Sequence, residues 1–217
     1  GERMHVFVTG GTGYIGRHLI PKLIARGHQV AALARPTSAN RLVPGCRAVL
    51  GDALDAASYV REIGEAETLV HLVGVAHPGP GKAAQFRSID LASARAVLAV
   101  AAEAGIKHLV YLSVAQPAPV MHAYVAARAE AEAMIRARGI TASILRPWYV
   151  LGPGHRWPLL LLPAYALCER LAGTRETAQR LGLVSIEQMA NALLRSIEGP
   201  PQGVRVWGVP EIRAAKG

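Results

Sequence analysis

Short apolar runs alternate along the chain with longer segments in which apolar residues recur at helical spacing. The runs at 4–9, 30–34, 48–50, 68–73, 108–113 and 142–146 are mostly aliphatic and predict buried strands. The segments at 14–25, 85–104 and 124–137 predict helices, and Gly27, Gly105 and Gly139 follow them as is typical of helix ends. Strands separated by helices of this length indicate βαβ units and a parallel sheet.

The alternation breaks after Val150. Gly152 opens a turn, and the most apolar stretch of the chain, 157–168, follows it. Ser185 and Gln188 have the spacing of a capping box that opens a helix to about Ile197, and 204–209 predicts a last strand. We therefore expect an α/β protein: a Rossmann-type doubly wound parallel sheet over residues 4–153, with a small C-terminal substrate or lid region, 154–217, packed on it as a single compact unit.

A glycine-rich turn, Thr9-Gly10-Gly11-Thr12-Gly13-Tyr14-Ile15-Gly16, lies between the first strand and the first helix. In this context Gly10 permits the tight turn, Gly13 lets the backbone approach a pyrophosphate, and Gly16 allows close packing of the helix on the strand. The helix amino terminus stabilises the phosphate charge. We expect a dinucleotide to contact Gly10, Thr12, Gly13, Tyr14, Ile15 and Gly16.

The residues after the second strand favour NADP(H) over NAD(H). Enzymes that use NAD usually place an acid there to bind the ribose 2′-hydroxyl, whereas this chain has Arg35 and no Asp or Glu from Arg17 through Gly51. A guanidinium can bind a 2′-phosphate with two hydrogen bonds, and Ser38 can add a hydroxyl donor.

Further cofactor contacts are expected where later strands end. Asp52 and Ala53 follow the third strand, where a carboxylate suits the adenine amine, although Asp52 can equally cap the helix that follows. The backbone of Val73 and Gly74, after the fourth strand, is expected near the cofactor ribose.

The net charge and the composition bear on which classes of partner the chain can bind. The formal net charge is +9, but aromatic residues are only 5% and the basic residues are dispersed, which argues against nucleic-acid binding. The 157–168 stretch is too short to span a bilayer, so it predicts a buried helix, a substrate-pocket wall or a peripheral membrane contact. Cys46 and Cys168 lack metal or redox spacing and indicate reduced thiols in a cytoplasmic protein.

Taken together, the glycine-rich turn, Gly51-Asp52, Val110-Tyr111-Leu112-Ser113 and Leu145-Arg146-Pro147 resemble the short-chain dehydrogenase/reductase superfamily. The resemblance is nearest to its extended and atypical branch, which includes NmrA-like, complex I 39-kDa-subunit-like and NAD-dependent epimerase/dehydratase-like proteins. It covers residues 4 to about 153, and its motifs are specific for the superfamily and weak for the substrate. Dimerisation through 85–104 and 124–137, and contact of Pro147 with the nicotinamide region, are expectations of this resemblance.

The resemblance also implies a catalytic set. Ser113 matches the serine that orients the substrate oxygen, and Tyr124 matches the tyrosine that donates or accepts the proton. Four residues after Tyr124 the superfamily has a lysine that lowers the tyrosine pKa and holds the nicotinamide ribose, but this chain has Arg128. Arginine stays charged and can still stabilise a nearby phenolate, but it is bulkier and forked and cannot copy a compact ammonium bound to ribose hydroxyls. Three interpretations stay open: Arg128 takes the lysine role, the chain binds the cofactor without dehydrogenase chemistry, or Tyr124 is simply an aromatic residue at a helix start.

Two functions therefore stay open: an NADP(H)-dependent oxidoreductase acting on a small or hydrophobic substrate, and a non-catalytic NADP(H)-binding redox sensor or assembly protein. His122 is an alternative acid or base, and His71 is expected as a packed strand residue. His71 and His77 form no recognised ligand set with a third residue, so no metal is predicted.

Overall fold

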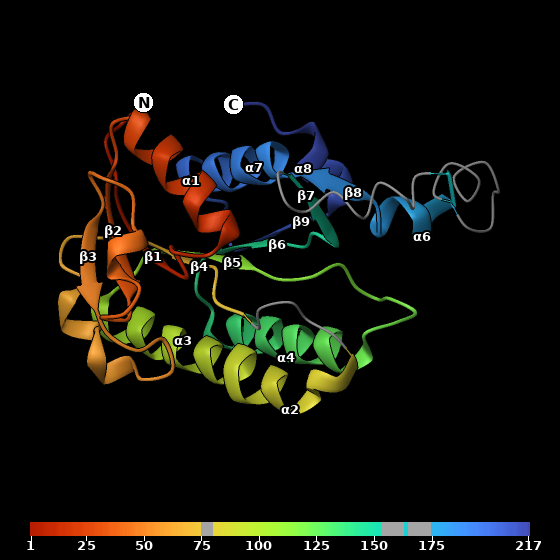
Figure 1. The fold of residues 1–217 in the computed structure, drawn as a ribbon, viewed down its shortest axis with the longest axis horizontal. Coiled ribbons are helices and arrows are strands. Elements are labelled where there is room, and N and C mark those ends of the chain that lie inside the picture. Colours follow the sequence, from red (N-terminus) through yellow and green to blue (C-terminus); the bar gives the residue numbers. More distant parts are fainter. Residues whose placement is uncertain (75–79, 153–162, 165–174) are drawn as a thin grey trace.

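The computed structural model describes residues 1–74, 80–152, 163–164 and 175–217. Its centre is a seven-stranded sheet in the order β3-β2-β1-β4-β5-β6-β9, in which every neighbouring pair is parallel (Figure 1). The strands are β1(His5–Thr9), β2(Gln29–Ala34), β3(Arg47–Leu50), β4(Thr68–His71), β5(His108–Leu112), β6(Ala142–Leu145) and β9(Val204–Trp207). The strand order reverses between β1 and β4, which opens a crevice at the carboxyl ends of these strands.

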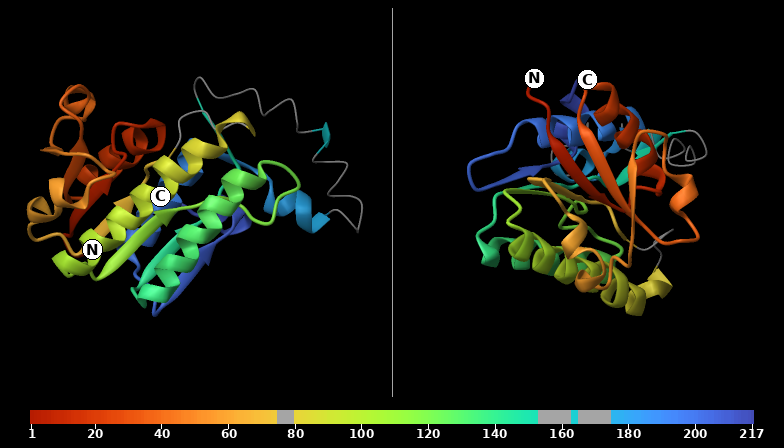
Figure 2. Two further views of the ribbon diagram at one scale, coloured as in Figure 1. Left: turned by 90° about the horizontal axis from the view of Figure 1, so that it is seen from below. Right: turned by 90° about the vertical axis from the view of Figure 1, so that its left-hand side faces the viewer.

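Helices cover both faces of the sheet, so the prediction of a doubly wound fold is confirmed (Figures 1 and 2). One face carries α1(Tyr14–Ala25), α7(Ile186–Glu198) and α8(Val209–Ala214). The other carries α2(Ala83–Gln85), the π-helical stretch η5(Phe86–Leu91), α3(Ala92–Ala104) and α4(His122–Arg138). The short 3₁₀ turns are η1(Ala39–Arg41), η2(Ala56–Ser58), η3(Val60–Glu62) and η4(Pro80–Lys82).

A second, two-stranded parallel sheet lies beside the main one. It pairs β7(Tyr149–Leu151) with β8(Leu183–Ser185), and α6(Arg175–Arg180) precedes β8. The capping box predicted at the start of α7 is confirmed: Ser185 Oγ accepts from the Gln188 N–H at 3.0 Å, and Gln188 Oε1 accepts from the Ser185 N–H at 2.9 Å.

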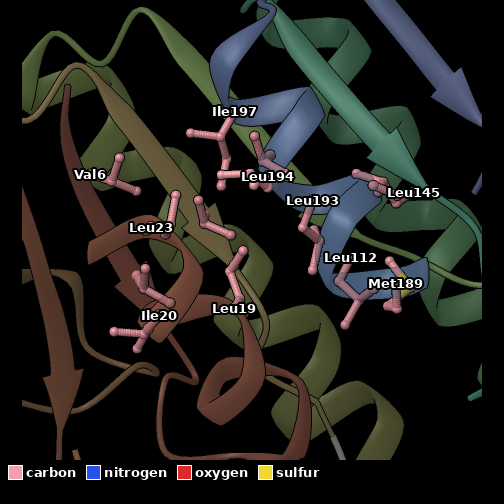
Figure 3. Packing of buried hydrophobic residues seen from close by; sticks show 14 of the residues in the cluster. Val6, Leu19, Ile20, Leu23, Leu112, Leu145, Met189, Leu193, Leu194 and Ile197 are labelled. Atoms are coloured by element: carbon pink, nitrogen blue, oxygen red, sulfur yellow. The ribbon is translucent and has the colours of Figure 1, made fainter. Parts of the chain in front are cut away.

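The apolar faces of α1 and α7 meet above the sheet and form the core on that side (Figure 3). Leu19 and Leu23 of α1 and Leu193 and Ile197 of α7 are fully buried. Burying each such side chain contributes about 1.5–3 kcal/mol. The C-terminal segment therefore helps to hold the first βαβ unit, which carries the glycine-rich turn.

Three differences from the sequence prediction concern the helix at 85–104 and the last strand. The predicted helix at 85–104 begins two residues earlier, at Ala83, and contains the π-helical stretch. The last strand ends at Trp207, because Val209 and Pro210 begin α8. That strand pairs with β6 and completes the main sheet, although the sequence boundary puts it in the C-terminal region.

The apolar stretch at 157–168 lies outside the described residues except for 163–164. In the part of the chain that the structure describes, no helix combines the length and the apolar character needed to cross a bilayer.

Candidate cofactor and active site

The glycine-rich turn has the geometry that its sequence predicts. Gly10 has a φ of +77°, and a Cβ there would lie 2.7 Å from the carbonyl carbon of Leu72. A Cβ on Gly16 would lie 2.6 Å from Gly11 Cα, so side chains are excluded where helix and turn touch. Gly13 is the N-cap of α1, and no side chain caps that end. The amino terminus of α1 is thus open to an anion.

Beside the turn lies a cavity of about 420 Å³ at the carboxyl ends of β1 and β2. It brings together six of the residues predicted to bind the cofactor, Gly10, Thr12, Arg35, Ser38, Ala53 and Val73. Five further residues complete its lining: Leu33, Ala34, Thr37, Arg41 and Gly51. Among the described lining residues two are arginines and none is an acid, so the cavity favours an anionic group.

A compact turn orders the backbone that carries Arg35 and Arg41, the two arginines of this cavity. The carbonyl oxygen of Arg35 accepts hydrogen bonds from the N–H groups of Ser38 and Ala39, both at 3.0 Å. Ser38 Oγ donates to the same oxygen at 3.3 Å, and Arg41 ends the η1 turn that follows. Arg35 and Arg41 are both exposed. Arg41 lines the cavity as well, although the sequence analysis did not assign it to the site.

Asp52 has a local partner. Its Oδ1 accepts from the Leu54 N–H at 2.9 Å, and its own N–H donates to Ser58 Oγ at 2.9 Å. The carboxylate therefore closes a turn, while Asp55 caps η2. Asp52 therefore does not cap the helical turn that follows, since Asp55 does so, and its adenine contact stays a prediction.

Arg128 lies buried beneath the crevice. Its Nη2 donates to Asp90 Oδ1 at 2.6 Å, and its Nη1 donates to the carbonyl oxygen of Leu112. The two side chains are 6% and 1% exposed. Burial by itself lowers the pKa of Arg128, but Tyr124, Tyr111 and Asp90 outweigh it and raise that pKa above its ordinary value. The guanidinium is therefore a permanent buried cation.

Tyr124 lies in the first turn of α4 and is partly exposed. The Cζ of Arg128 is 5.4 Å from the centre of its ring, within the range of a cation–π contact. The Phe86 ring lies 5.1 Å away on η5. Tyr124 is thus held between an aromatic ring and a charged guanidinium.

Ser113, one residue past β5, points into the protein. It is 2% exposed, and its Oγ donates to Glu132 Oε2 at 2.5 Å. The same carboxylate accepts from Gln116 Nε2 at 2.5 Å and from Arg146 Nη2 at 2.6 Å. Glu132 is therefore a buried acceptor that joins the ends of β5 and β6 to α4, and it holds the hydroxyl proton of Ser113.

The other predicted residues occupy different parts of the site. Gly74 lies against the Arg128–Asp90 pair, where a Cβ would collide with Arg128 Nη2. Pro147 is buried, and its carbonyl oxygen accepts from the Ala115 N–H at 3.0 Å. Tyr14 is partly buried, and its hydroxyl is where a side chain on Gly152 would be.

The histidines have separate roles. His71 Nδ1 lies 2.6 Å from Thr9 Oγ1 and its Nε2 lies 3.3 Å from Ser93 Oγ. Burial, together with Arg128, lowers the pKa of His71 to about 3, so it is a neutral packed residue. His122 is exposed at the start of α4, and His77 lies outside the described residues. Within the described ranges, no three His, Cys, Asp or Glu side chains gather as a metal site.

Sequence reasoning missed Asp90, Gln116 and Glu132. Asp90 lies in a mostly apolar helix, and Glu132 follows Arg128 by one helical turn. An acid amid apolar neighbours hints at a buried partner, but the partners are 38 and 19 residues away for the Asp90–Arg128 and Ser113–Glu132 bonds. No local pattern identifies such pairs.

A glycine-rich turn that opens a helix at the strand-order switch defines a dinucleotide-binding Rossmann protein. The profile of the NAD(P)H-binding family matches residues 10–155. The chain belongs to this family, and the match fits the resemblance of its motifs to the extended and atypical short-chain dehydrogenases/reductases.

Two curated relatives are reductases. The ceramide reductase of Caulobacter vibrioides is 27% identical over 92% of this chain and 62% of its own length. The 4-hydroxy-2-methyl-3-oxo-4-farnesyl-3,4-dihydroquinoline-1-oxide ketoreductase of Stigmatella aurantiaca is 28% identical over 69% of this chain and 51% of its own length. The chain thus spans about half to three fifths of the length of these relatives.

Solved structures share the fold. The Bordetella bronchiseptica enzyme WbmH, in complex with NAD+, has a TM-score of 0.70 at 19% identity and covers 95% of this chain and 76% of its own. A UDP-galactose 4-epimerase has a TM-score of 0.69 at 19% identity, over 94% of this chain and 76% of its own. These likenesses concern the fold alone.

Proposed function

We propose that the chain is an NADP(H)-dependent reductase that converts a hydrophobic ketone to an alcohol. The cavity lined by Arg35 and Arg41, without an acid among its described residues, is the observation that carries the choice of NADP(H). A 2′-phosphate there would receive charge-assisted hydrogen bonds, which are about twice as strong as neutral ones. The names of the two curated relatives support a ketone with long apolar groups.

The residues present fit such a cofactor. The turn at Gly10–Gly16 and the open end of α1 would hold the pyrophosphate, and Val73 and Gly74 would face the ribose. When bound, NADPH supplies the hydride that reduces the carbonyl carbon. Tyr124 donates its phenolic proton to the carbonyl oxygen, and Arg128 beneath its ring stabilises the phenolate left behind.

In the proposed reaction, the Ser113 hydroxyl cannot give its proton to the substrate as an unbonded hydroxyl could. Because its proton is donated to Glu132, the Ser113 oxygen can meet any further group only as an acceptor. Ser113 therefore shapes the end of β5, and the proton that reaches the substrate comes from Tyr124.

A titration tests the cofactor. We expect NADPH to bind at least about tenfold more tightly than NADH, and Arg35→Asp to remove most of that difference, since about 1.4 kcal/mol of binding is lost per tenfold. Arg213→Asp is a matched control, because it changes the net charge equally on exposed α8. Equal affinities of the unmodified protein for NADPH and NADH would contradict the proposal.

Turnover tests the reaction. With a panel of long-chain and cyclic ketones, Tyr124→Phe should lower kcat at least about a hundredfold and leave the NADPH Kd unchanged. NADPH oxidation is followed by absorbance.

The alternative function is an NADP(H)-binding sensor or assembly protein without turnover. The commitment of Arg128 to Asp90 and of Ser113 to Glu132 favours it, because both side chains are held by protein partners. Tight NADPH binding with no ketone reduced across the panel would select this alternative.

A further inference from the structure

Both terminal nitrogens of Arg128 are used inside the protein. Nη2 donates to Asp90, and Nη1 donates to the carbonyl oxygen of Leu112. Leu112 is the last residue of β5. The Asp90 bond, at 2.6 Å between side chains that are 6% and 1% exposed, is a buried charge-assisted hydrogen bond. Breaking it would leave the buried guanidinium without its counter-charge, so the guanidinium stays in place.

Two aromatic rings lie beside the guanidinium group of Arg128. Its Cζ lies 5.4 Å from the centre of the Tyr124 ring and 5.9 Å from the centre of the Tyr111 ring. Tyr111 is buried within β5, while Tyr124 is partly exposed. Of the two rings beside the buried charge, that of Tyr124 is therefore the one that solvent or a substrate can reach.

The residue that passes over the Arg128–Asp90 pair is a glycine, Gly74. A Cβ on Gly74 would lie 2.9 Å from Asp90 Oδ1 and would collide with Arg128 Nη2. The chain after β4 thus lies directly against the ion pair. Asp90 itself comes from the π-helical stretch, a local departure from α-helical geometry of the kind often found at functional sites.

We propose that Asp90 is a positioning residue, which holds the Arg128 guanidinium under the Tyr124 ring so that Arg128 acts on the Tyr124 phenol and not as a ligand of the cofactor. The predicted effect of Asp90 on turnover rests on the proposed reductase function. The geometric part of the inference, the dependence of Arg128 on Asp90, stands independently of any substrate.

The first measurement needs no substrate. In the wild-type protein the guanidinium N–H resonances of Arg128, assigned by their loss in Arg128→Lys, should exchange slowly with water in ¹⁵N NMR spectra. Asp90→Asn keeps an oxygen acceptor and should keep this protection, whereas Asp90→Ala should lose it. Tyr124→Leu should shift these resonances, because the ring that lies over Cζ is gone. Unprotected resonances in the wild-type protein, or no shift in Tyr124→Leu, would overturn the placement.

The second measurement separates positioning from cofactor binding. Asp90→Ala should lower kcat at least about tenfold, with the ketone KM and the NADPH Kd within about twofold of wild type. Asp90→Asn should restore kcat to within about threefold, because its oxygen still accepts from Nη2. A tenfold weaker NADPH Kd in Asp90→Ala would show that Arg128 serves the cofactor, and an unchanged kcat would show that Asp90 positions nothing.

Two further variants serve as a replacement for Asp90→Ala and as a control. If Asp90→Ala does not fold, Arg128→Lys replaces it: an ammonium cannot copy the fork that reaches both Asp90 and Leu112, so kcat should fall about tenfold with an unchanged NADPH Kd. Glu198→Gln is the control, because it removes the ion pair with Arg26 away from this site and should leave kcat unchanged. If the wild-type protein reduces no ketone, the reductase proposal fails, and the NMR result still decides the placement of Arg128.

Discussion

Single residues decide how close the backbone comes to the buried charges. Gly74 illustrates this, because the glycine is required by what lies under it: the space of a methyl group is filled by Arg128 and Asp90. The sequence placed Gly74 near the ribose only because it follows the end of the fourth strand. The ion pair beneath it became visible only in three dimensions, because Asp90 and Arg128 belong to different helices.

Gly74→Ala should destabilise the protein by about 1–3 kcal/mol, since one extra methyl group must displace the ion pair or the loop. Urea unfolding followed by circular dichroism measures the change. Gly81→Ala is the matched control, because its Cβ would meet nothing within 4 Å, and its free energy of unfolding should not fall. Equal effects of the two substitutions would show that the space under Gly74 is not filled as described.

At the scale of elements, one carboxylate joins three of them. Glu132 of α4 accepts from Ser113 and Gln116, which follow β5, and from Arg146, which follows β6. The carboxyl ends of the two strands are thereby fixed relative to α4, the helix that carries Tyr124. Packing alone leaves such loop ends free to shift, so this contact fixes where α4, and with it Tyr124, lies relative to the ends of β5 and β6.

Glu132→Gln should lower the free energy of unfolding by about 2–4 kcal/mol, because the partly buried Arg146 loses its counter-charge. Chemical denaturation measures it. Glu130→Gln, two residues earlier on the same helix, removes only exposed ion pairs at 3.8 and 4.0 Å and should change stability by less than about 0.5 kcal/mol. A similar loss in both variants would argue against the role of Glu132.

Ser113→Ala gives a separate test at this scale. Because the Ser113 hydroxyl proton is bound by Glu132, we expect Ser113→Ala to lower kcat for ketone reduction much less than Tyr124→Phe does. A loss of kcat equal to that of Tyr124→Phe would mean that the hydroxyl donates to the substrate.

Elements with a strong local pattern were predictable. The first helix has the bounds the sequence predicts, 14–25, and the capping box at Ser185 and Gln188 is confirmed by both of its hydrogen bonds. The pair β7 and β8 was not predicted, because three residues are too few to show an alternation. In the site, Arg35 was predictable from its place after β2, whereas Asp90 and Glu132 act through partners distant in the sequence.

For the whole molecule, buried neutral histidines make stability depend on pH. Burial lowers the pKa of His71 to about 3 and of His108 to about 4. Below the ordinary histidine pKa the unfolded chain binds protons that the folded protein does not, so stability falls as the pH falls through 6.5 and continues to fall toward 4.

We expect each of these two histidines to lower the free energy of unfolding by about 2 kcal/mol when the pH falls from 7.5 to 5. Denaturation at both pH values measures the difference, and His108→Gln should reduce it. His122→Gln, at an exposed position, is the control. A pH dependence that is unchanged in His108→Gln would contradict the assignment.

The seventh strand of the sheet has a consequence for how the protein is made. β9 and α7 come from the last residues of the chain, yet they cover the edge of β6 and the apolar face of α1. A nascent chain leaving the ribosome therefore carries an open strand edge and a bare helix face until synthesis has passed Trp207. During that interval the apolar face of α1 and the edge of β6 lack their partners, so the nascent chain is exposed to aggregation and to chaperones.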